Sequence, residues 1–309
     1  MTQRLLIHYV AGLVSLVFLL GSCQPKQDIP EPNGPVPANL LETSKLDSVI
    51  TLTEQVDFSI ATETGKGPQG ALIRWDNPYF FKAFTYNDKG RLLYTFQVEK
   101  NGIRFAEIAQ YQGAYLTASY VSDKFDYTQS KVRVGYFTKY KYNTDKRLSQ
   151  TLDYSRVGET NTFKLSSLIK YEYNAAGQLQ LTRTLPAQGL RLFYYVRYWE
   201  NGDCVRAEAY RPTDKTELNP MVSQYNYVYN KQINPLTALS LQPALQPSSH
   251  YQTQSRVYDY SGQSINNTYE DESKYRYGFD AQGRLVTMQA QLNWSGLGWS
   301  APDKFTYAP

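Results

Sequence analysis

A short turn motif recurs along this chain, and it limits the possible folds more than any other feature. Tyr86–Leu92 reads Tyr-Asn-Asp-Lys-Gly-Arg-Leu and joins two runs in which apolar and polar residues alternate. This pattern is typical of a β-hairpin, because Asn, Asp and Gly accept the backbone angles of a tight turn. Altered copies occupy Tyr142–Leu148, Tyr173–Leu179, Tyr198–Val205 and Phe279–Leu285. Turn glycines that are expected to need a positive φ are Gly90, Gly177, Gly202 and Gly283.

The runs beside these turns predict the fold class. Phe84 before the first turn and Tyr94 and Phe96 after it are expected on one apolar face, with Thr85 and Thr95 on the other. Such alternation describes a sheet buried on one side, and short connections make neighbouring strands antiparallel. The 28 tyrosines suit half-buried sheet faces. We expect an all-β antiparallel meander of hairpins that forms a strongly curved sheet or an incompletely closed barrel. A two-sheet β-sandwich is the alternative.

The N-terminal residues have the character of an export signal. Arg4 supplies a positive charge, and the apolar run from Leu5 to Leu20 is short for a helix that spans a membrane. The stretch Leu20–Cys23 reads Leu-Gly-Ser-Cys and resembles the bacterial lipobox, in which the Cys is acylated and becomes the first residue. An ordinary signal peptide with a chance Cys is the alternative. This resemblance implies a lipid attached to Cys23, and Gln24 after it favours sorting to the outer membrane.

The chain is expected to have three parts. Residues 1–22 form the lipoprotein signal peptide, and residues 23–38 form an acylated, proline-rich tether. Residues 39–309 form a single β-rich domain. Five prolines between Gln24 and Ala38 favour an extended, semi-rigid segment over a packed one. The expected location is therefore the outer membrane, with the protein lipid-anchored on the periplasmic face or on the cell surface.

Several kinds of chemistry lack the residues that they need. Only His250 remains after leader cleavage, so a metal site built from several histidines is excluded. The 32 Lys and Arg nearly balance 28 Asp and Glu, which argues against a nucleic-acid partner. Neither a phosphate-binding loop nor a dinucleotide fingerprint occurs, and no cofactor or metal is expected. Cys204 replaces the Leu of other copies and is expected to be a buried apolar residue. Glu270–Glu272 lacks the spacing of a calcium loop and reads as a solvated turn.

Binding is better supported than catalysis. Trp294 and Trp299 lie on a Gly/Ser-rich stretch near the C-terminus, where exposed indoles would stack on sugars or on a partner. The alternative is that these rings plug one end of the sheet. The expected function is that of a non-enzymatic lipoprotein that binds a glycan, a lipid or a cell-envelope protein through its aromatic-rich sheet. A carboxylate-dependent hydrolase and an integral outer-membrane barrel are the two alternatives.

The turns also carry a family resemblance. Their aromatic-x-x-x-Gly-polar-Leu pattern resembles YD repeats, the Tyr-Asp hairpin modules of bacterial Rhs-type surface and secreted proteins. Together with the lipobox and Tyr229–Leu236, which ends in Asn-Pro-Leu, it makes the chain similar to a lipoprotein family of Bacteroidetes-type bacteria whose fold is porin-like and whose function is unknown. Lys146 in place of the turn Gly departs from the pattern. The resemblance implies a fold and a location, and it transfers no catalytic residue.

Overall fold

The computed structural model describes eleven stretches of the chain. They are residues 35–43, 47–54, 56–58, 63–102, 104–122, 133–186, 193–211, 221–233, 250–259, 269–292 and 298–309. The chain divides into Met1–Asn33 and Gly34–Pro309, and every described residue belongs to the second unit. Apart from a 3₁₀ segment, η1 (Ala38–Leu40), the regular structure of the described residues is β-strand.

Nine of the described strands lie in the first part of the chain. They are β1 (Val49–Thr51), β2 (Leu72–Asp76), β3 (Phe80–Tyr86), β4 (Leu92–Glu99), β5 (Arg104–Gln112), β6 (Tyr115–Ser122), β7 (Val134–Tyr142), β8 (Leu148–Arg156) and β9 (Thr162–Tyr173). The second half adds β10 (Leu179–Pro186), β11 (Phe193–Glu200), β12 (Asp203–Tyr210), β13 (Met221–Ile233), β14 (His250–Asp259), β15 (Tyr269–Phe279), β16 (Leu285–Leu292) and β17 (Asp303–Tyr307).

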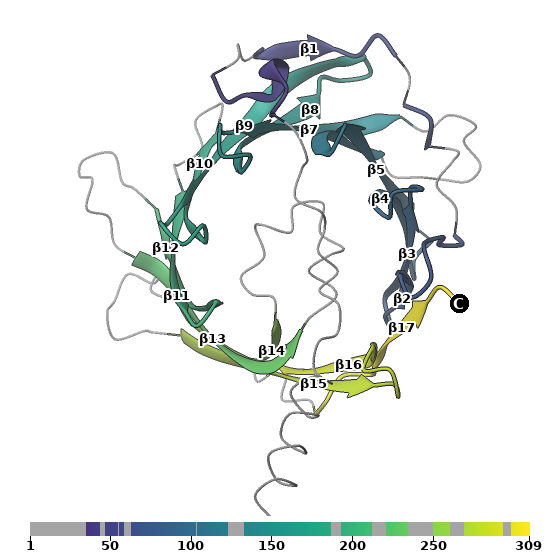
Figure 1. The fold of residues 1–309 in the computed structure, drawn as a ribbon, viewed down its shortest axis with the longest axis vertical. Coiled ribbons are helices and arrows are strands. Elements are labelled where there is room, and N and C mark those ends of the chain that lie inside the picture. Colours follow the sequence, from purple (N-terminus) through teal and green to yellow (C-terminus); the bar gives the residue numbers. More distant parts are fainter. Residues whose placement is uncertain are drawn as a thin grey trace, which may run out of the picture. The chain divides into compact units, whose positions relative to one another are not determined.

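Within the part of the chain that is described, the sixteen strands from β2 to β17 form a closed barrel (Figure 1). Each strand pairs antiparallel with the next one in sequence. The seam is also antiparallel, with Phe305 of β17 opposite Trp75 of β2. The predicted all-β antiparallel meander is confirmed, and the barrel is fully closed rather than incomplete or split into two sheets. Closure pairs both edge strands, so the sheet presents no long open edge.

Four of the turns share one hydrogen-bond scheme. In the first, the Oδ1 atom of Asn87 accepts hydrogen bonds from the backbone N–H groups of Lys89 and Arg91, at 3.0 and 2.9 Å. The N–H of Gly90 then donates to the carbonyl of Asn87 at 3.0 Å, with φ of +72° at the glycine. In the turns that begin at Asn143, Asn174 and Asp280, the N–H of the fourth residue likewise donates to the carbonyl of the first residue. The side chain of the first residue again accepts a hydrogen bond from the N–H of the fifth residue. A short amide or carboxylate side chain thus builds the turn, and the fourth position takes a left-handed backbone.

The turn at Gly202 has a different form. Only two residues, Asn201 and Gly202, separate Glu200 from Asp203, and their φ angles are +51° and +90°. Two successive positive φ values define the tight hairpin turn for which Asn-Gly is preferred. Lys146 has φ of +66° at the position that is glycine in the related turns.

Aromatic side chains link each hairpin to the one before it in sequence. Tyr142 donates its hydroxyl to the carbonyl of Leu116 at 2.9 Å, and Tyr173 donates to the carbonyl of Leu148 at 2.7 Å. The other hydrogen bonds of this set are Tyr86 to Leu72, Tyr111 to Leu92, Trp199 to Leu179, Tyr229 to Cys204 and Tyr277 to Gln252. We call this set of seven side chain to carbonyl bonds the aromatic clasp. In the repeats that begin at Tyr86, Tyr142 and Tyr173, the clasp residue is the aromatic residue before the turn.

The position of β1 identifies the outer face of the barrel. In Figure 1, β1 lies outside the ring of strands. Ile50 of β1 packs against an apolar cluster that contains Phe137, Tyr154 and Phe163, so these rings point outward. Directly paired residues on neighbouring strands share a face, and successive residues along a strand alternate between faces. The strand register therefore shows, for the other strands of the barrel, which side chains point outward and which point inward.

The register gives the two faces opposite characters in the second half of the barrel. Its outer face carries the polar residues Gln224, Asn226, Gln254, Arg256, Glu272, Lys274, Arg276, Gln289 and Gln291. Its inner face carries Tyr195, Arg197, Ala207, Ala209, Tyr225, Tyr227, Tyr275, Tyr277 and Met288.

The expectation that one apolar face continues through each turn is wrong. Phe84 pairs with Thr95 and points inward, whereas Phe96 pairs with Ala83 and points outward. The register shifts between Thr85 and Tyr86, and comparable shifts occur next to the turns of later hairpins. A β-bulge adds one residue to one strand, so alternation counted across it transfers side chains to the other face.

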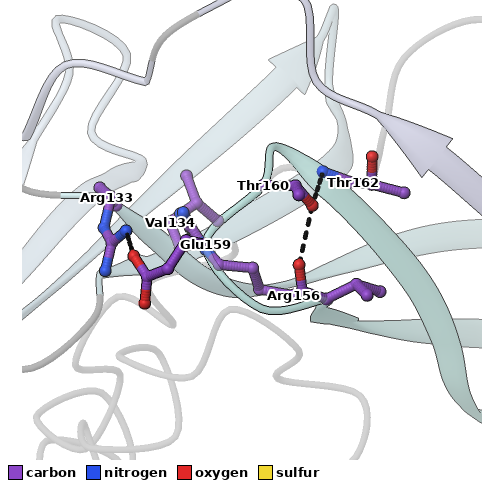
Figure 2. Close-up of polar contacts among 7 residues, drawn as sticks. Arg133, Val134, Arg156, Glu159, Thr160 and Thr162 are labelled. Carbon is purple, nitrogen blue, oxygen red and sulfur yellow. Dashed lines mark hydrogen bonds and ion pairs between the residues drawn. The ribbon is translucent and has the colours of Figure 1, made fainter.

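The N-terminal part of the described chain covers the outer face of β3–β9. Phe58 is 3% exposed in the outer cluster with Phe96 and Phe137. Near the β8–β9 turn, Arg133 and Glu159 form an ion pair, and the Thr162 N–H donates to Thr160 Oγ1 at 3.1 Å (Figure 2). This cover explains why the outer face of these strands also carries apolar residues.

Candidate functional site

The inner face of β11–β13 carries a row of aromatic rings that we call the tyrosine ladder. It comprises Tyr195 of β11 and Tyr225, Tyr227 and Tyr229 of β13. Successive ring centroids lie 6.5, 6.5 and 6.3 Å apart, and the rings of Tyr225 and Tyr227 are nearly parallel, at 9°. All four side chains are only half-buried. An elongated ligand could stack on such a row, because each ring offers an apolar face and a polar hydroxyl.

Small residues on β12 allow the ladder to cross from β11 to β13. Ala209 lies opposite Tyr195, and Ala207 lies between Arg197 and Tyr225. Ala209 is completely buried, and Ala207 is 6% exposed. Because β12 contributes only methyl groups here, the rings of Tyr195 and Tyr225 approach each other over it.

Arg197 places a cation beside the ladder. Its Nη1 donates to Thr182 Oγ1 at 2.7 Å, and its guanidinium lies 5.9 Å from the centre of the Tyr195 ring. Burial lowers the pKa of Arg197, and the groups that oppose this shift are Cys204 and tyrosines. Among the residues that the structure describes, no carboxylate pairs with Arg197. The ladder is therefore an aromatic surface with a positive charge that its own neighbours do not neutralise.

Burial also affects the ladder hydroxyls. It raises the pKa of Tyr195, Tyr227 and Tyr229 above the ordinary value for tyrosine. These phenols therefore stay protonated at neutral pH, and they present O–H groups that can donate as well as accept hydrogen bonds.

A second group on the inner face combines two acids with a lysine. Asp153 accepts hydrogen bonds from Thr138 Oγ1 at 2.8 Å and from Ser167 Oγ at 2.7 Å. Burial raises the pKa of Glu107, against the opposing effect of Lys82, and burial lowers the pKa of Lys82. Asp153 is thus held by hydroxyl groups, whereas burial raises the pKa of Glu107, and unlike environments for two carboxyl groups are what the hydrolase alternative requires.

The two tryptophans and the lipid-attachment residue have different outcomes. Cys23 and Trp294 lie outside the described residues. Trp299 is 37% exposed and lies against Arg276 of the outer face, with the guanidinium 4.4 Å from the ring centre. Trp299 therefore does not belong to the inner tyrosine ladder.

His250 and Cys204 have structural contacts in this fold. The Nδ1 atom of His250 lies 2.7 Å from Asp203 Oδ1, which ties the first residue of β14 to the first residue of β12. Cys204 is completely buried, and burial raises the pKa of its thiol. A buried thiol with a raised pKa is not a reactive nucleophile. Cys204 fills the place of the repeat Leu, as expected from the sequence.

Two features are absent from the described residues. No group of three or more His, Cys, Asp or Glu side chains is arranged to hold a metal ion in these stretches. No helix in them is both long and apolar enough to cross a membrane.

The sequence analysis expected an aromatic-rich sheet to bind, but it singled out neither the ladder tyrosines nor Arg197. Alternate residues of β11 lie on opposite faces, with Arg197 inside and Tyr194 outside, where Tyr194 stacks on Tyr210 at 5.0 Å. The usable signal was the polar residue within the run Phe193–Glu200, where a single Arg interrupts an aromatic sequence.

Comparison with solved structures finds matches at low sequence identity. A porin-like protein from Bacteroides uniformis ATCC 8492 is 14% identical, with a TM-score of 0.44, over 80% of this chain and 100% of that one. A porin-like protein from Bacteroides vulgatus ATCC 8482 is 10% identical, with a TM-score of 0.47, over 77% of this chain and 99% of that one. No protein-family profile and no curated protein sequence matches this chain.

Proposed function

We propose that this protein is a lipid-anchored envelope protein whose barrel stands in water and binds an elongated glycan along the tyrosine ladder. The observation that carries the proposal is the contrast between the inner face of β11–β16 and the outer face of β13–β16. Aromatic rings gather on the inner face, and charged and amide side chains are prominent on the outer face of β13–β16. An envelope location rests on the lipobox-like sequence that ends at Cys23.

The outer face argues against insertion into lipid. Arg256 and Lys274 both form ion pairs with Glu272, at 3.0 and 3.1 Å, and Arg276 lies on the same face. A lysine or arginine that faces lipid at the middle of a bilayer costs about 2–4 kcal/mol in a membrane barrel. Three such cations with an acid, set among amides, leave no continuous apolar band on these strands. The same residues are well solvated in water, where they disfavour association of the barrel with lipid or with other barrels.

The inner face suits a sugar chain because it combines rings with hydrogen-bonding groups. Sugar rings present apolar C–H faces that stack on aromatic rings, and their hydroxyls bond to phenols, amides and guanidinium groups. The tyrosine ladder offers both over four consecutive rings. Half-buried tyrosines also lose little conformational freedom on binding, which favours affinity for a weakly hydrophobic ligand.

An integral outer-membrane barrel is the second candidate, and the topology favours it. An even number of antiparallel strands in a closed meander, with mainly short turns at one end, is the pattern of bacterial membrane barrels. The two candidates differ in a simple property. A protein that begins at Gln24 and carries no lipid stays monomeric without detergent if its barrel stands in water, and it aggregates if its barrel belongs in lipid.

Glycan binding is tested with the full chain on an array of linear glycans, followed by titration of the ligands that bind. Tyr225→Ala removes a ladder ring and is expected to weaken binding by about tenfold or more. Tyr258→Ala removes a half-buried tyrosine from the outer face of the adjacent β14 and is the matched control. Failure of every glycan to bind, or equal affinity of both variants, would overturn the proposal.

Anchoring is tested separately from binding. Cys23→Ala is expected to move the protein from the membrane fraction of cells to the soluble fraction, because it removes the residue that carries the lipid. Retention of the Cys23→Ala protein in the membrane fraction, resistant to high salt, would contradict lipid anchoring and favour the integral barrel.

A further inference from the structure

Three pairs of side chains repeat along the inner face of β6–β11. Ser119 Oγ and the hydroxyl of Tyr140 lie 3.0 Å apart. Thr151 Oγ1 and the hydroxyl of Tyr171 lie 2.9 Å apart. In both of these pairs a small hydroxyl residue on one strand contacts a tyrosine on the next strand in sequence.

The third pair keeps the small hydroxyl but changes its partner. Thr182 on β10 receives a hydrogen bond from Arg197 on β11, at 2.7 Å. Arg197 therefore occupies the place that Tyr140 and Tyr171 hold in the earlier pairs. A tyrosine would satisfy the threonine without any charge, so the hydrogen bond to Thr182 does not account for the choice of arginine.

The charge at this place has an energetic cost that the described residues do not offset. Burial lowers the pKa of Arg197, which means that its charged form is less well solvated here than in water. The outer-face cations differ, since Arg183 pairs with Glu172 at 3.3 Å and Arg256 pairs with Glu272 at 3.0 Å. A partly desolvated cation without a carboxylate partner is stabilised when an anionic ligand supplies one.

We infer that the site at Arg197 takes an anionic group, the carboxylate or sulfate ester of an acidic glycan. This inference rests on the proposed glycan-binding function and adds the charge of the ligand. The planar guanidinium donates two parallel hydrogen bonds to the anion, and Tyr195 lies beside it with a ring that stacks on the sugar. Uncharged sugars of the same chain bind to the rest of the ladder.

The experiment compares charged and neutral forms of one glycan with the full-length protein. Oligogalacturonate is titrated against its methyl ester, and dextran sulfate against dextran. Arg197→Tyr restores the residue type of the earlier pairs and so preserves the contact with Thr182. Arg183→Ala removes an outer-face cation of the neighbouring strand and is the matched control for general electrostatic attraction.

The expected result is that an acidic form binds at least about tenfold more tightly than its neutral counterpart, the size of one charge-assisted hydrogen bond. Arg197→Tyr abolishes this preference, and Arg183→Ala keeps it. Equal binding of acidic and neutral forms by the unaltered protein would overturn the inference and leave glycan binding intact. Preference that persists in Arg197→Tyr would overturn it as well. Binding of neither form, in either glycan, together with a blank glycan array, would overturn both proposals.

Discussion

The aromatic clasp makes a sharp prediction about single hydroxyl groups. Tyr142→Phe removes the donor of the 2.9 Å bond to the Leu116 carbonyl and keeps the ring, which packs edge-on against Tyr115 at 5.1 Å. Tyr142 and Leu116 are 9% and 5% exposed, so water cannot readily replace the lost hydroxyl. A buried hydrogen bond contributes about 1 kcal/mol net, and a carbonyl left unsatisfied costs about 1–3 kcal/mol. We expect a loss of about 1–2 kcal/mol in the free energy of unfolding.

Urea unfolding followed by circular dichroism measures this loss, provided that the slope against urea is unchanged. Tyr136→Phe is the control, because Tyr136 is 50% exposed and its hydroxyl makes no hydrogen bond to the described residues. The control is expected to change the free energy by less than about 0.5 kcal/mol. Equal, small effects of Tyr142→Phe and Tyr136→Phe would refute the reasoning, since the clasp bonds would then contribute nothing to stability.

Two further predictions concern the same end of the barrel. Burial raises the pKa of Tyr171 and Tyr173 to about 12, above about 10 in the unfolded chain. The folded state therefore holds these protons more tightly, so their contribution to stability is complete below about pH 10 and is lost as the pH rises to about 12. Tyrosinate absorbance should thus rise together with unfolding, and ionisation near pH 10 with unchanged urea midpoints would contradict this. Gly90→Ala is expected to cost about 1 kcal/mol, because φ is +72° while the nearest atom to an added Cβ is 3.8 Å away. Gly298→Ala, where φ is not positive and nothing lies within 4 Å, is the control, and equal melting temperatures of the two variants would exclude strain at the turn.

The local parts of the fold were predictable because their signals are local. An Asn or Asp followed three residues later by Gly or Lys contains the whole turn, since the side chain of the first residue bonds the backbone of the third or the fifth. Alternation identified the strands because side chains in a strand have a period of two. Neither signal depends on residues far away in the sequence.

The faces were not predictable in this way. The bulge beside Tyr86 adds one residue to the strand, and the sequence contains no local signal for it. Phe84 and Phe96 therefore lie on opposite faces of the sheet, although their spacing predicts one face. Closure depends on Phe305 meeting Trp75, two residues at opposite ends of the domain with no local signal for the contact. The charged residue of the site, Arg197, was equally hard to predict from the sequence. It becomes distinctive only when the strand register shows that it contacts Thr182 in the place where an earlier pair has a tyrosine.

The structure also revises the weight of the integral-barrel alternative. From the sequence, this barrel was one of two alternatives to a non-enzymatic lipoprotein. The topology now favours it, because the sixteen described strands close into an even antiparallel barrel. The outer-face charges at Arg256, Glu272 and Lys274 provide the stronger argument against it, since they form a paired polar cluster where a membrane barrel needs an apolar band.

Spin labels on the outer face can decide whether this surface meets water or lipid. Lys274→Cys and Gln289→Cys each place one reactive thiol there, because Cys204 is completely buried and Cys23 is acylated in the proposed form. The measurement is electron paramagnetic resonance power saturation of the full-length protein bound to vesicles. Relaxation of both labels by a water-soluble nickel chelate, with little effect of oxygen, is the predicted result. Relaxation dominated by oxygen, the sign of a hydrocarbon surrounding, would contradict a barrel that stands in water.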